Sequence, residues 1–239
     1  CSRTVSCCCK TATQMAPSWL AQAEKLVSQT RHRLEVEEQF DDYADEFEDH
    51  LVNTLEYHLP EVIAGKLAAG CFRCCLDLGC GTGLCGRTLK ASAKIEKLVG
   101  VDLSASMLAR AREGGGYDEL HHCDLVSALK SHPSAKADLV VAADVLVYLV
   151  HLDKFFAEAH RVLMEGGTLV FSTEQAEEHE HTEGPVLRES GRYAHSQPFI
   201  INSIKDLFTI VEIDTIPLRI EDDLPLAGDV YLLRRLKAS

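Results

Sequence analysis

Three glycines at alternate positions follow a short apolar run and precede a segment of helical length. The run Cys71–Leu78 is typical of a buried strand, and the residues after it are Gly79-Cys80-Gly81-Thr82-Gly83. Glycine adopts positive φ values without strain and leaves main-chain N–H groups open to a ligand that a Cβ atom would block. The stretch therefore predicts a strand, a tight turn that cradles a nucleotide-like ligand, and the helix Leu84–Lys90.

Strand-like and helix-like segments then alternate along the chain. We expect strands at Leu98–Leu103, Glu119–Cys123, Ala137–Ala143 and Thr168–Thr173, and helices at Ser106–Arg112, Leu125–Lys130 and Leu152–Leu163. Such alternation predicts parallel βαβ units with right-handed crossovers. The fold class is therefore α/β, with a doubly wound, mostly parallel sheet of seven strands. Ligands bind such a sheet beyond the carboxyl ends of its strands.

The two ends of the chain depart from this alternation. Residues 1–16 predict a disordered tail, and residues 17–66 a helical cap with a helix at Pro17–Glu38 and an amphipathic helix pair that ends near Pro60. Residues 67–239 predict the α/β domain. Its last elements are a helix at Phe199–Phe208 and an antiparallel hairpin, whose strands Thr209–Ile216 and Val230–Arg235 are joined by the loop Pro217–Gly228.

Charge restricts the classes of partner. The chain has 239 residues, with 37 acidic against 24 Lys and Arg residues and a formal net charge of −13. A polyanion-binding surface needs a basic face, and the sequence contains no Lys/Arg cluster that would build one. Nucleic acid is therefore disfavoured as a substrate. A small molecule fits best, and a basic protein segment is the alternative.

Ten cysteines raise the question of disulfides or a metal. Six of them lie in or beside the expected core strands and the turn, where cysteine acts as a small hydrophobe. Cys71 and Cys74 have metal-ligand spacing, but no second pair is suitably placed, so we expect no metal and reduced thiols. No apolar run reaches membrane-spanning length and no signal peptide is readable. We expect a cytoplasmic protein, with an organelle transit tail at residues 1–16 as the alternative.

The glycine spacing resembles the first motif of the class I S-adenosylmethionine (SAM) methyltransferases. A dinucleotide fingerprint would need glycine where this chain has Leu84, which disfavours a nicotinamide dehydrogenase. An acidic residue, Asp77, precedes the glycines. The resemblance implies that Asp77 lies near the cationic methionine end of SAM and that the turn residues Gly79, Cys80, Gly81 and Gly83 contact the cofactor.

Acidic residues also end the next two strands. Asp102, followed by Leu103, can accept two hydrogen bonds from a ribose diol, although it could instead cap the next helix as Ser104 or Ser106 could. Met107 either packs on the adenine or fills the core. Three more candidates at this edge have cofactor roles. Asp124 would accept from the adenine amine, with helix capping as the alternative, and the N–H of Leu125 would meet a ring nitrogen of the adenine. Ala143 has a small side chain where the sulfonium would pass.

As a set, these elements resemble the class I methyltransferases over residues 71–174. That resemblance implies the Rossmann-like fold, SAM as cofactor and methyl transfer as the reaction. A closer likeness runs to predicted bacterial methyltransferases that carry tetratricopeptide repeats ahead of the catalytic domain. It rests on Phe40-Asp41-x-Tyr43-Ala44-x-x-Phe47-x-x-His50-Leu51, on residues 142–148 and on Gly191-Arg192-Tyr193-Ala194-His195-Ser196. Repeats are not evident here, and the subgroup implies no acceptor.

Methyl transfer from a sulfonium is an in-line displacement that mainly needs alignment and exclusion of water. A base is needed only for a protonated nucleophile, and His195, Tyr193 and Asp144 are the candidates. His195 could equally be a structural histidine. Tyr43 is a candidate contact to the cofactor's carboxylate from a lid, and a helix that merely covers the sheet edge is the alternative. A SAM-binding assembly protein without turnover is the second functional hypothesis.

Overall fold

The computed structural model describes residues 33–44, 47–53, 55–177, 180, 184–221 and 223–237. The chain forms two units, residues 1–36 and residues 37–239. Of the first unit only residues 33–36 are described, and they are helical. The predicted tail and most of the predicted helix Pro17–Glu38 lie outside the described residues. The account below concerns the second unit.

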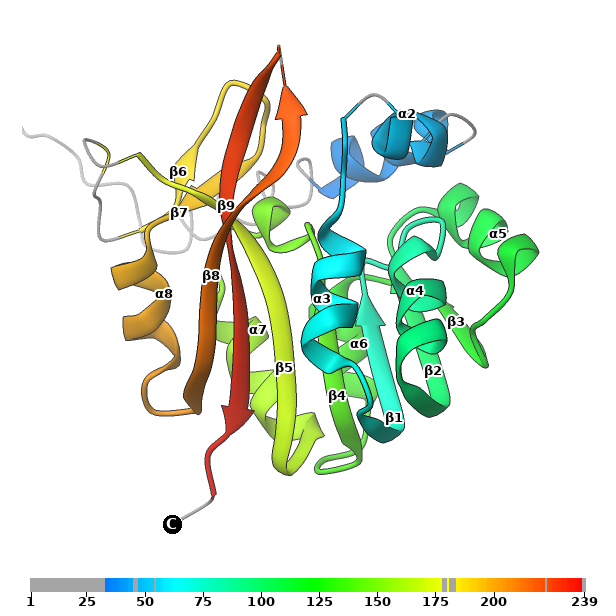
Figure 1. Cartoon of the computed structure of the whole chain (residues 1–239), viewed down its shortest axis with the longest axis vertical. Helices are drawn as coiled ribbons and strands as arrows, with labels where there is room; N and C mark the ends of the chain where they lie inside the picture. Colours follow the sequence, from blue (N-terminus) through cyan, green and yellow to red (C-terminus); the bar gives the residue numbers. More distant parts are fainter. Residues whose placement is uncertain are drawn as a thin grey trace, which may run out of the picture. The chain divides into compact units, whose positions relative to one another are not determined.

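A mixed sheet forms the centre of the second unit (Figure 1). Its order is β3-β2-β1-β4-β5-β7-β6, and β9 pairs with both β5 and β8. The strands are β1 Cys71–Leu78, β2 Lys94–Asp102, β3 Glu119–His122, β4 Ala137–Ala142, β5 Leu163–Gln175, β6 Val186–Leu187, β7 Tyr193–His195, β8 Phe208–Glu221 and β9 Leu224–Arg235. The strands β3, β2, β1, β4 and β5 pair in parallel, whereas β9 runs antiparallel to β5 and to β8. This is the predicted Rossmann-like arrangement with a C-terminal antiparallel hairpin.

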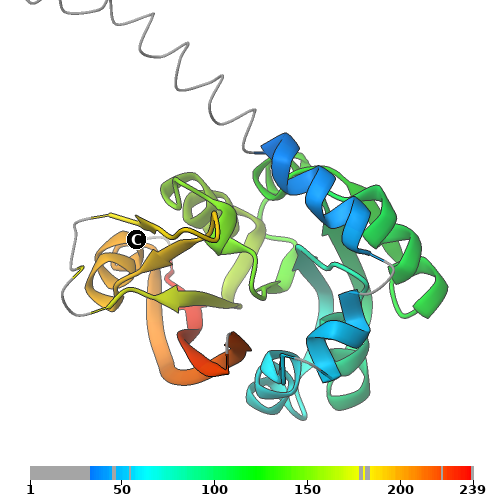
Figure 2. The ribbon, with the colours of Figure 1, turned by 90° about the horizontal axis from the view of Figure 1, so that it is seen from above.

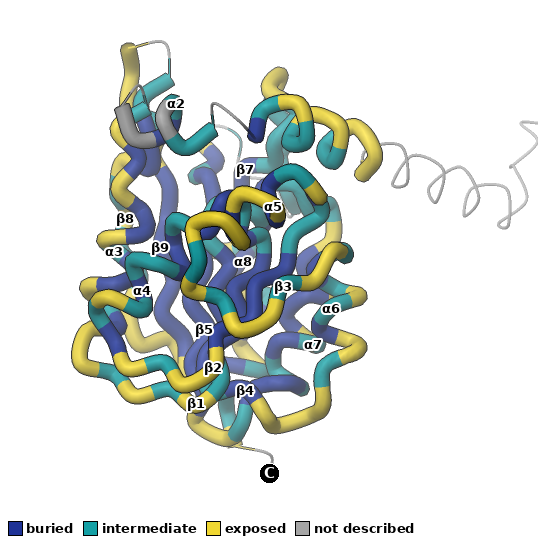
Figure 3. Tube along the Cα trace, turned by 90° about the vertical axis from the view of Figure 1, so that its right-hand side faces the viewer, coloured by how far each residue is buried: buried dark blue, intermediate teal, exposed yellow. Residues whose placement is uncertain are grey.

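Helices cover both faces of this sheet (Figure 2). They are α2 Phe47–Asn53, α3 Leu59–Leu67, α4 Leu84–Ser92, α5 Ala105–Gly114, α6 Leu125–Ser131, the short 3₁₀ helix η1 Leu146–Tyr148, α7 Asp153–Val162 and α8 Gln197–Ile204. One core lies under α6, α7 and α8 and contains Phe155, Phe156 and Ile200. The other lies under α3 and α4 and contains Ile63 and Leu89. The central strands are buried between the two cores (Figure 3).

The predicted loop Pro217–Gly228 is wrong. β8 continues to Glu221 and β9 begins at Leu224, so most of this stretch is paired strand. Proline is tolerated at position 217 because β8 pairs only with β9, and the ladder register shifts between Pro217 and Arg219. Because β8 continues past Pro217, the strand carries Arg219 back toward the ends of the parallel strands.

One further expectation, on Pro60, differs from the structure. Pro60 does not end a helix but lies in the first turn of α3, where a missing N–H costs nothing. All seven predicted strands are present, and the short strands β6 and β7 extend the sheet beyond β5. Within the described part of the chain, no helix is long and apolar enough to span a membrane.

The parallel strands all end at the same edge of the sheet. Helix α2 lies at that edge, at the end toward which β1 points (Figure 1). We call residues 37–53 the cap segment; residues 37–43 and 47–53 of it are helical. The edge and the cap segment together carry the residues that the sequence singled out.

Candidate cofactor and acceptor site

The glycine turn takes the backbone conformation that its sequence predicts. Gly79, Gly81 and Gly83 have φ values of 72°, 53° and 90°. A Cβ atom on Gly79 would lie 2.4 Å from Val145 Cγ2, so this position also requires a residue without a side chain. The N–H groups of Gly79 and Cys80 donate to the carbonyl of Val101, which fixes the turn against the end of β2. Gly83 then forms the left-handed N-cap of α4.

Asp102 lies at the end of β2 and is held from both sides. Its Oδ2 accepts the N–H of Gly81 at 2.8 Å, and its Oδ1 accepts the N–H of Ser104 at 2.9 Å. Burial raises the pKa of this carboxyl, and these backbone hydrogen bonds oppose that rise. Each ionised carboxylate oxygen has two acceptor sites, so both oxygens keep one for a diol. Ser104, and not Asp102, caps α5 by accepting from the N–H of Met107.

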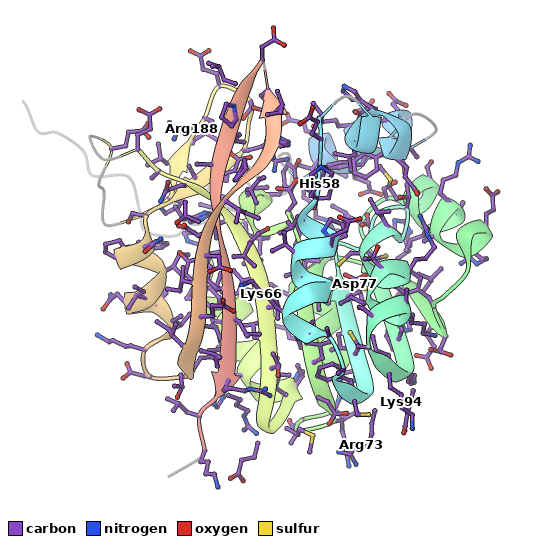
Figure 4. The ribbon with its side chains drawn as sticks, in the orientation of Figure 1. His58, Lys66, Arg73, Asp77, Lys94 and Arg188 are labelled. Carbon is purple, nitrogen blue, oxygen red and sulfur yellow. The ribbon has the colours of Figure 1, made fainter. Side chains whose placement is uncertain are left out.

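Asp77 is buried at the end of β1 and contacts a residue that sequence reasoning missed (Figure 4). Tyr117 donates its hydroxyl to Asp77 Oδ2 at 2.6 Å. Burial raises the pKa of Asp77 to about 6, and the hydrogen bond from Tyr117 acts in the opposite direction. Glycines at positions 86 and 100 make room for the tyrosine ring, since a Cβ atom at either would lie under 3 Å from it.

The other predicted cofactor residues lie at the same edge in different surroundings. Asp124 caps α6 by accepting from the N–H of Ser127, which is the alternative that its sequence position left open. Met107 is fully buried, Leu125 and Cys80 are buried, and Leu103 and Ala143 are half-buried.

The cap segment is attached to the turn and to α5. Glu48 accepts from Thr82 Oγ1 at 3.0 Å and pairs with Arg87 at 2.6 Å, which ties α2 to the glycine turn. Asp41 accepts from the N–H of Ser106 at 3.0 Å and from the hydroxyl of Ser104. The hydroxyl of Tyr43, the predicted lid residue, bonds His50 within the segment itself.

A buried ionic cluster occupies the other half of the edge, beyond β4 and β5. We define it as Asp144, Tyr148, Glu174, Arg192 and Arg219. Arg192 contacts Asp144 Oδ1 and the Tyr148 hydroxyl, each at 2.5 Å, and also pairs with Glu174. Arg219 donates to Glu174 Oε1 at 2.7 Å and lies 3.5 Å from Asp144.

Burial and the nearby arginines shift the pKa values of Glu174 and Tyr148. Burial would raise the pKa of Glu174, but Arg192 and Arg219 outweigh it, so the pKa is lowered. Burial raises the pKa of Tyr148 to about 12, so its phenol is neutral at physiological pH. Asp144 has a φ of 52°, and its N–H donates to Ser172 Oγ, so its backbone is held as firmly as its side chain.

His195, one of the candidate bases, is the last residue of β7. Its side chain is fully buried and stacks on Phe199 with ring centroids 6.0 Å apart. Neither ring nitrogen has a hydrogen-bond partner within the described part of the chain. Burial lowers its pKa to about 4, so the imidazole is neutral at physiological pH. Tyr193, in the same strand β7, is half-buried.

The sequence pointed to the glycine turn, Asp102 and Asp144, but not to the ionic contacts that Asp144 makes. Arg192 was noticed only as part of a motif, and Arg219 lay in the region expected to be a loop. Glu174 is the penultimate residue of β5, and only its position after an apolar run could have drawn attention to it. For Tyr117 a signal existed, because a glycine inside a strand, such as Gly100, often marks a close approach of another group.

Comparison with known proteins agrees with this geometry. Residues 76–171 match the family model described as a methyltransferase domain. A malonyl-[acyl-carrier protein] O-methyltransferase from Hahella chejuensis is 33% identical over 125 residues, which cover 52% of this chain and 44% of the relative. The chain thus spans less than half the length of this curated relative.

Solved structures match over a larger share of the chain. A chain from the complex between the Haloferax volcanii Trm112 methyltransferase activator and a methyltransferase has a TM-score of 0.70 at 17% identity, covering 85% of this chain and 99% of its own. The N-methyltransferase NodS from Bradyrhizobium japonicum, solved with S-adenosyl-L-homocysteine, has a TM-score of 0.64 at 17% identity, covering 84% and 98%. Residues 76–171 are therefore similar to a methyltransferase domain, and the chain shares the Rossmann-like fold of these solved structures.

Proposed function

We propose that the chain is a SAM-dependent methyltransferase that transfers a methyl group to a small-molecule acceptor, with a protein acceptor as the alternative. The single observation that carries this proposal is the position of Asp102. Its two carboxylate oxygens are held by the N–H groups of Gly81 and Ser104, next to a turn whose three glycines have no Cβ atom to block a ligand. A carboxylate fixed in this way is suited to a ribose diol.

The residues at this edge fit the chemistry of SAM. In the proposal, Asp102 binds the ribose and Asp77 faces the ammonium of the methionine end, while Gly79, Cys80, Gly81 and Gly83 line the cofactor. The adenine is assigned to Leu103, Met107, Asp124 and Leu125, the passage of the sulfonium to Ala143, and the methionine carboxylate to Tyr43. When bound, SAM supplies an activated methyl group. The protein's part is to align the acceptor and to exclude water.

The acceptor end is proposed to lie at the ionic cluster. Phe40 of the cap segment packs edge-on against Tyr148 with ring centroids 5.5 Å apart, and the Arg192 guanidinium lies over the Tyr148 ring, 5.0 Å from its centroid. The cluster thus joins the cap segment to β5, β7 and β8 around the ends of the strands. In this proposal Asp144, Tyr193 and His195 are the candidate bases, and burial lowers the pKa of His195 to about 4, so its imidazole is neutral near pH 7.

The likeness to methyltransferases with tetratricopeptide repeats gains support from the same contacts. Its three motif segments are far apart in the sequence, yet Phe40 of the first and Arg192 of the third both contact Tyr148 of the second. A shared acceptor site would explain why these segments occur together.

We propose residues 17–66 as a helical cap and residues 67–239 as the methyltransferase domain.

A catalytically silent SAM-binding protein is the competing function. It would keep the cofactor turn and Asp102 but would not consume SAM. Purified protein should be incubated with SAM carrying a labelled methyl group and with acceptor panels of carboxylates, phenols and amines. We expect formation of S-adenosylhomocysteine and a labelled product with one class of acceptor. Tight binding of S-adenosylhomocysteine without turnover on any class would favour the silent protein.

A further inference from the structure

Tyr117 occupies a space that the chain keeps open with glycines in three different elements. A Cβ atom on Gly86, inside α4, would lie 2.2 Å from the Tyr117 hydroxyl. A Cβ atom on Gly100, inside β2, would lie 2.8 Å from the ring, and one on Gly83 would lie 2.9 Å from it. Glycine costs stability in a helix or strand interior. The space needed by Tyr117 therefore explains why glycine stands inside α4 at position 86 and inside β2 at position 100.

The hydroxyl group, and not only the ring, is accommodated. Gly86 faces the hydroxyl end of Tyr117, so a phenylalanine would need less room at that point. The hydroxyl donates to Asp77 Oδ2 at 2.6 Å, across 40 residues of sequence. The acid, in turn, is the residue that precedes the glycine turn.

Among the residues that the structure describes, few groups other than Tyr117 orient the Asp77 carboxylate. The ionisable groups around it are Asp102 from β2, Cys75 from β1, Cys80 from the turn and Cys85 from α4. None of these carries a positive charge, and burial and Asp102 both disfavour the ionised carboxylate. Tyr117 is the group whose contact favours it.

We propose that Tyr117 is a positioning residue for the cofactor: its hydroxyl holds the Asp77 carboxylate, ionised and in one orientation, toward the cationic end of SAM. This inference rests on the proposed function, because it requires that Asp77 contact the cofactor. Tyr117 itself acts only through Asp77. The three glycines are then part of the cofactor site, although two of them lie outside the turn.

The test compares Tyr117→Phe with Tyr231→Phe. Tyr231 is also buried, and its hydroxyl also approaches an aspartate, Asp229 Oδ2 at 3.5 Å, but it lies in β9 under the other core. Affinity for S-adenosylhomocysteine is measured by calorimetry between pH 6 and pH 8.5. We expect Tyr117→Phe to bind about three- to tenfold more weakly than wild type at pH 6.5 and within about twofold at pH 8.5, where Asp77 is ionised in both. Tyr231→Phe should follow the wild-type profile.

A second measurement needs no ligand. The carboxyl ¹³C signal of Asp77, assigned by its loss in Asp77→Asn, should titrate about one pH unit higher in Tyr117→Phe than in wild type. An unchanged titration, or equal pH profiles of binding in wild type and Tyr117→Phe, would overturn the inference. If the carbon signal shifts but wild type itself does not bind S-adenosylhomocysteine, the proposed function fails and the hydrogen bond is structural only.

Discussion

The guanidinium of Arg192 contacts the carboxylate of Asp144 at 2.5 Å, although 48 residues separate the two in the sequence. Their side chains are 13% and 15% exposed, so the pair is largely removed from water. Arg192 precedes β7 and Asp144 follows β4, and Glu174 of β5 pairs with the same guanidinium. One arginine thus joins the ends of three strands at the edge where we place the acceptor.

Replacement of Arg192 should lower the free energy of unfolding substantially. Arg192→Gln leaves Asp144 and Glu174 buried with less compensation, and breaking a buried ion pair costs about 3–5 kcal/mol. Urea unfolding should show a loss of that size in the free energy of unfolding. Arg73→Gln is the control, because Arg73 is 69% exposed in its pair with Asp138 and such surface pairs contribute about 1 kcal/mol or less. Equal losses in the two variants would contradict a buried, strand-joining role for Arg192.

Asp77 should make the protein less stable at neutral pH. Its pKa in the folded state is about 6 against an ordinary value of 3.8, so the folded state binds more protons than the unfolded state between these values. Stability therefore falls as the pH rises through this range, by about 3 kcal/mol in total. Asp77→Asn removes the effect and keeps a carbonyl that can accept from Tyr117. We expect this variant to be more stable than wild type by about 1–3 kcal/mol at pH 7.5.

The pH series distinguishes this explanation from a general effect of the substitution. The stability gain of Asp77→Asn should shrink as the pH falls and should vanish near pH 4, where Asp77 is protonated in the folded state. The same variant should lose affinity for S-adenosylhomocysteine at every pH. A gain that does not change with pH would show that charge burial is not its cause.

Gly86 offers a test of the space occupied by Tyr117. Replacing a glycine inside a helix by alanine ordinarily stabilises a protein by about 1 kcal/mol. Gly65→Ala in α3 should show this gain, because nothing lies within 4 Å of the added Cβ atom. Gly86→Ala in α4 should instead destabilise by about 1–3 kcal/mol, since the new atom would overlap the Tyr117 hydroxyl. Thermal unfolding of both variants checks the opposite signs, and a gain in both would place Tyr117 elsewhere.

Local sequence patterns were enough to predict the sheet and the glycine turn. Positive φ values at Gly79, Gly81 and Gly83 follow from the spacing of those residues, and Asp102 follows from its place at a strand end. The same reasoning left open whether Asp102 and Asp124 contact the cofactor or cap a helix. The structure gives the cap of α5 to Ser104 and the cap of α6 to Asp124.

The ionic cluster could not be predicted, for a physical reason. Its contacts join residues 18 to 75 positions apart, and local periodicity carries no information on such pairs. Arg219 was hidden as well, because Pro217 suggested a loop where an edge strand tolerates proline. His195 was predicted as either a base or a structural histidine, and local pattern gave no sign that its ring is buried against Phe199 of α8.

The most direct test of the account is thermal unfolding of wild type with S-adenosylhomocysteine, with NAD as the control ligand. A ligand at a hundred times its Kd adds about 2.7 kcal/mol to stability, which corresponds to a rise in Tm of about 5–10 °C for a domain of this size. We predict this rise with S-adenosylhomocysteine and none with NAD. Asp102→Asn should abolish the rise, whereas Asp118→Asn, which also removes a carboxylate bonded to a backbone N–H, should retain it. No rise in wild type, or an equal rise in Asp102→Asn, would contradict a SAM site built around Asp102.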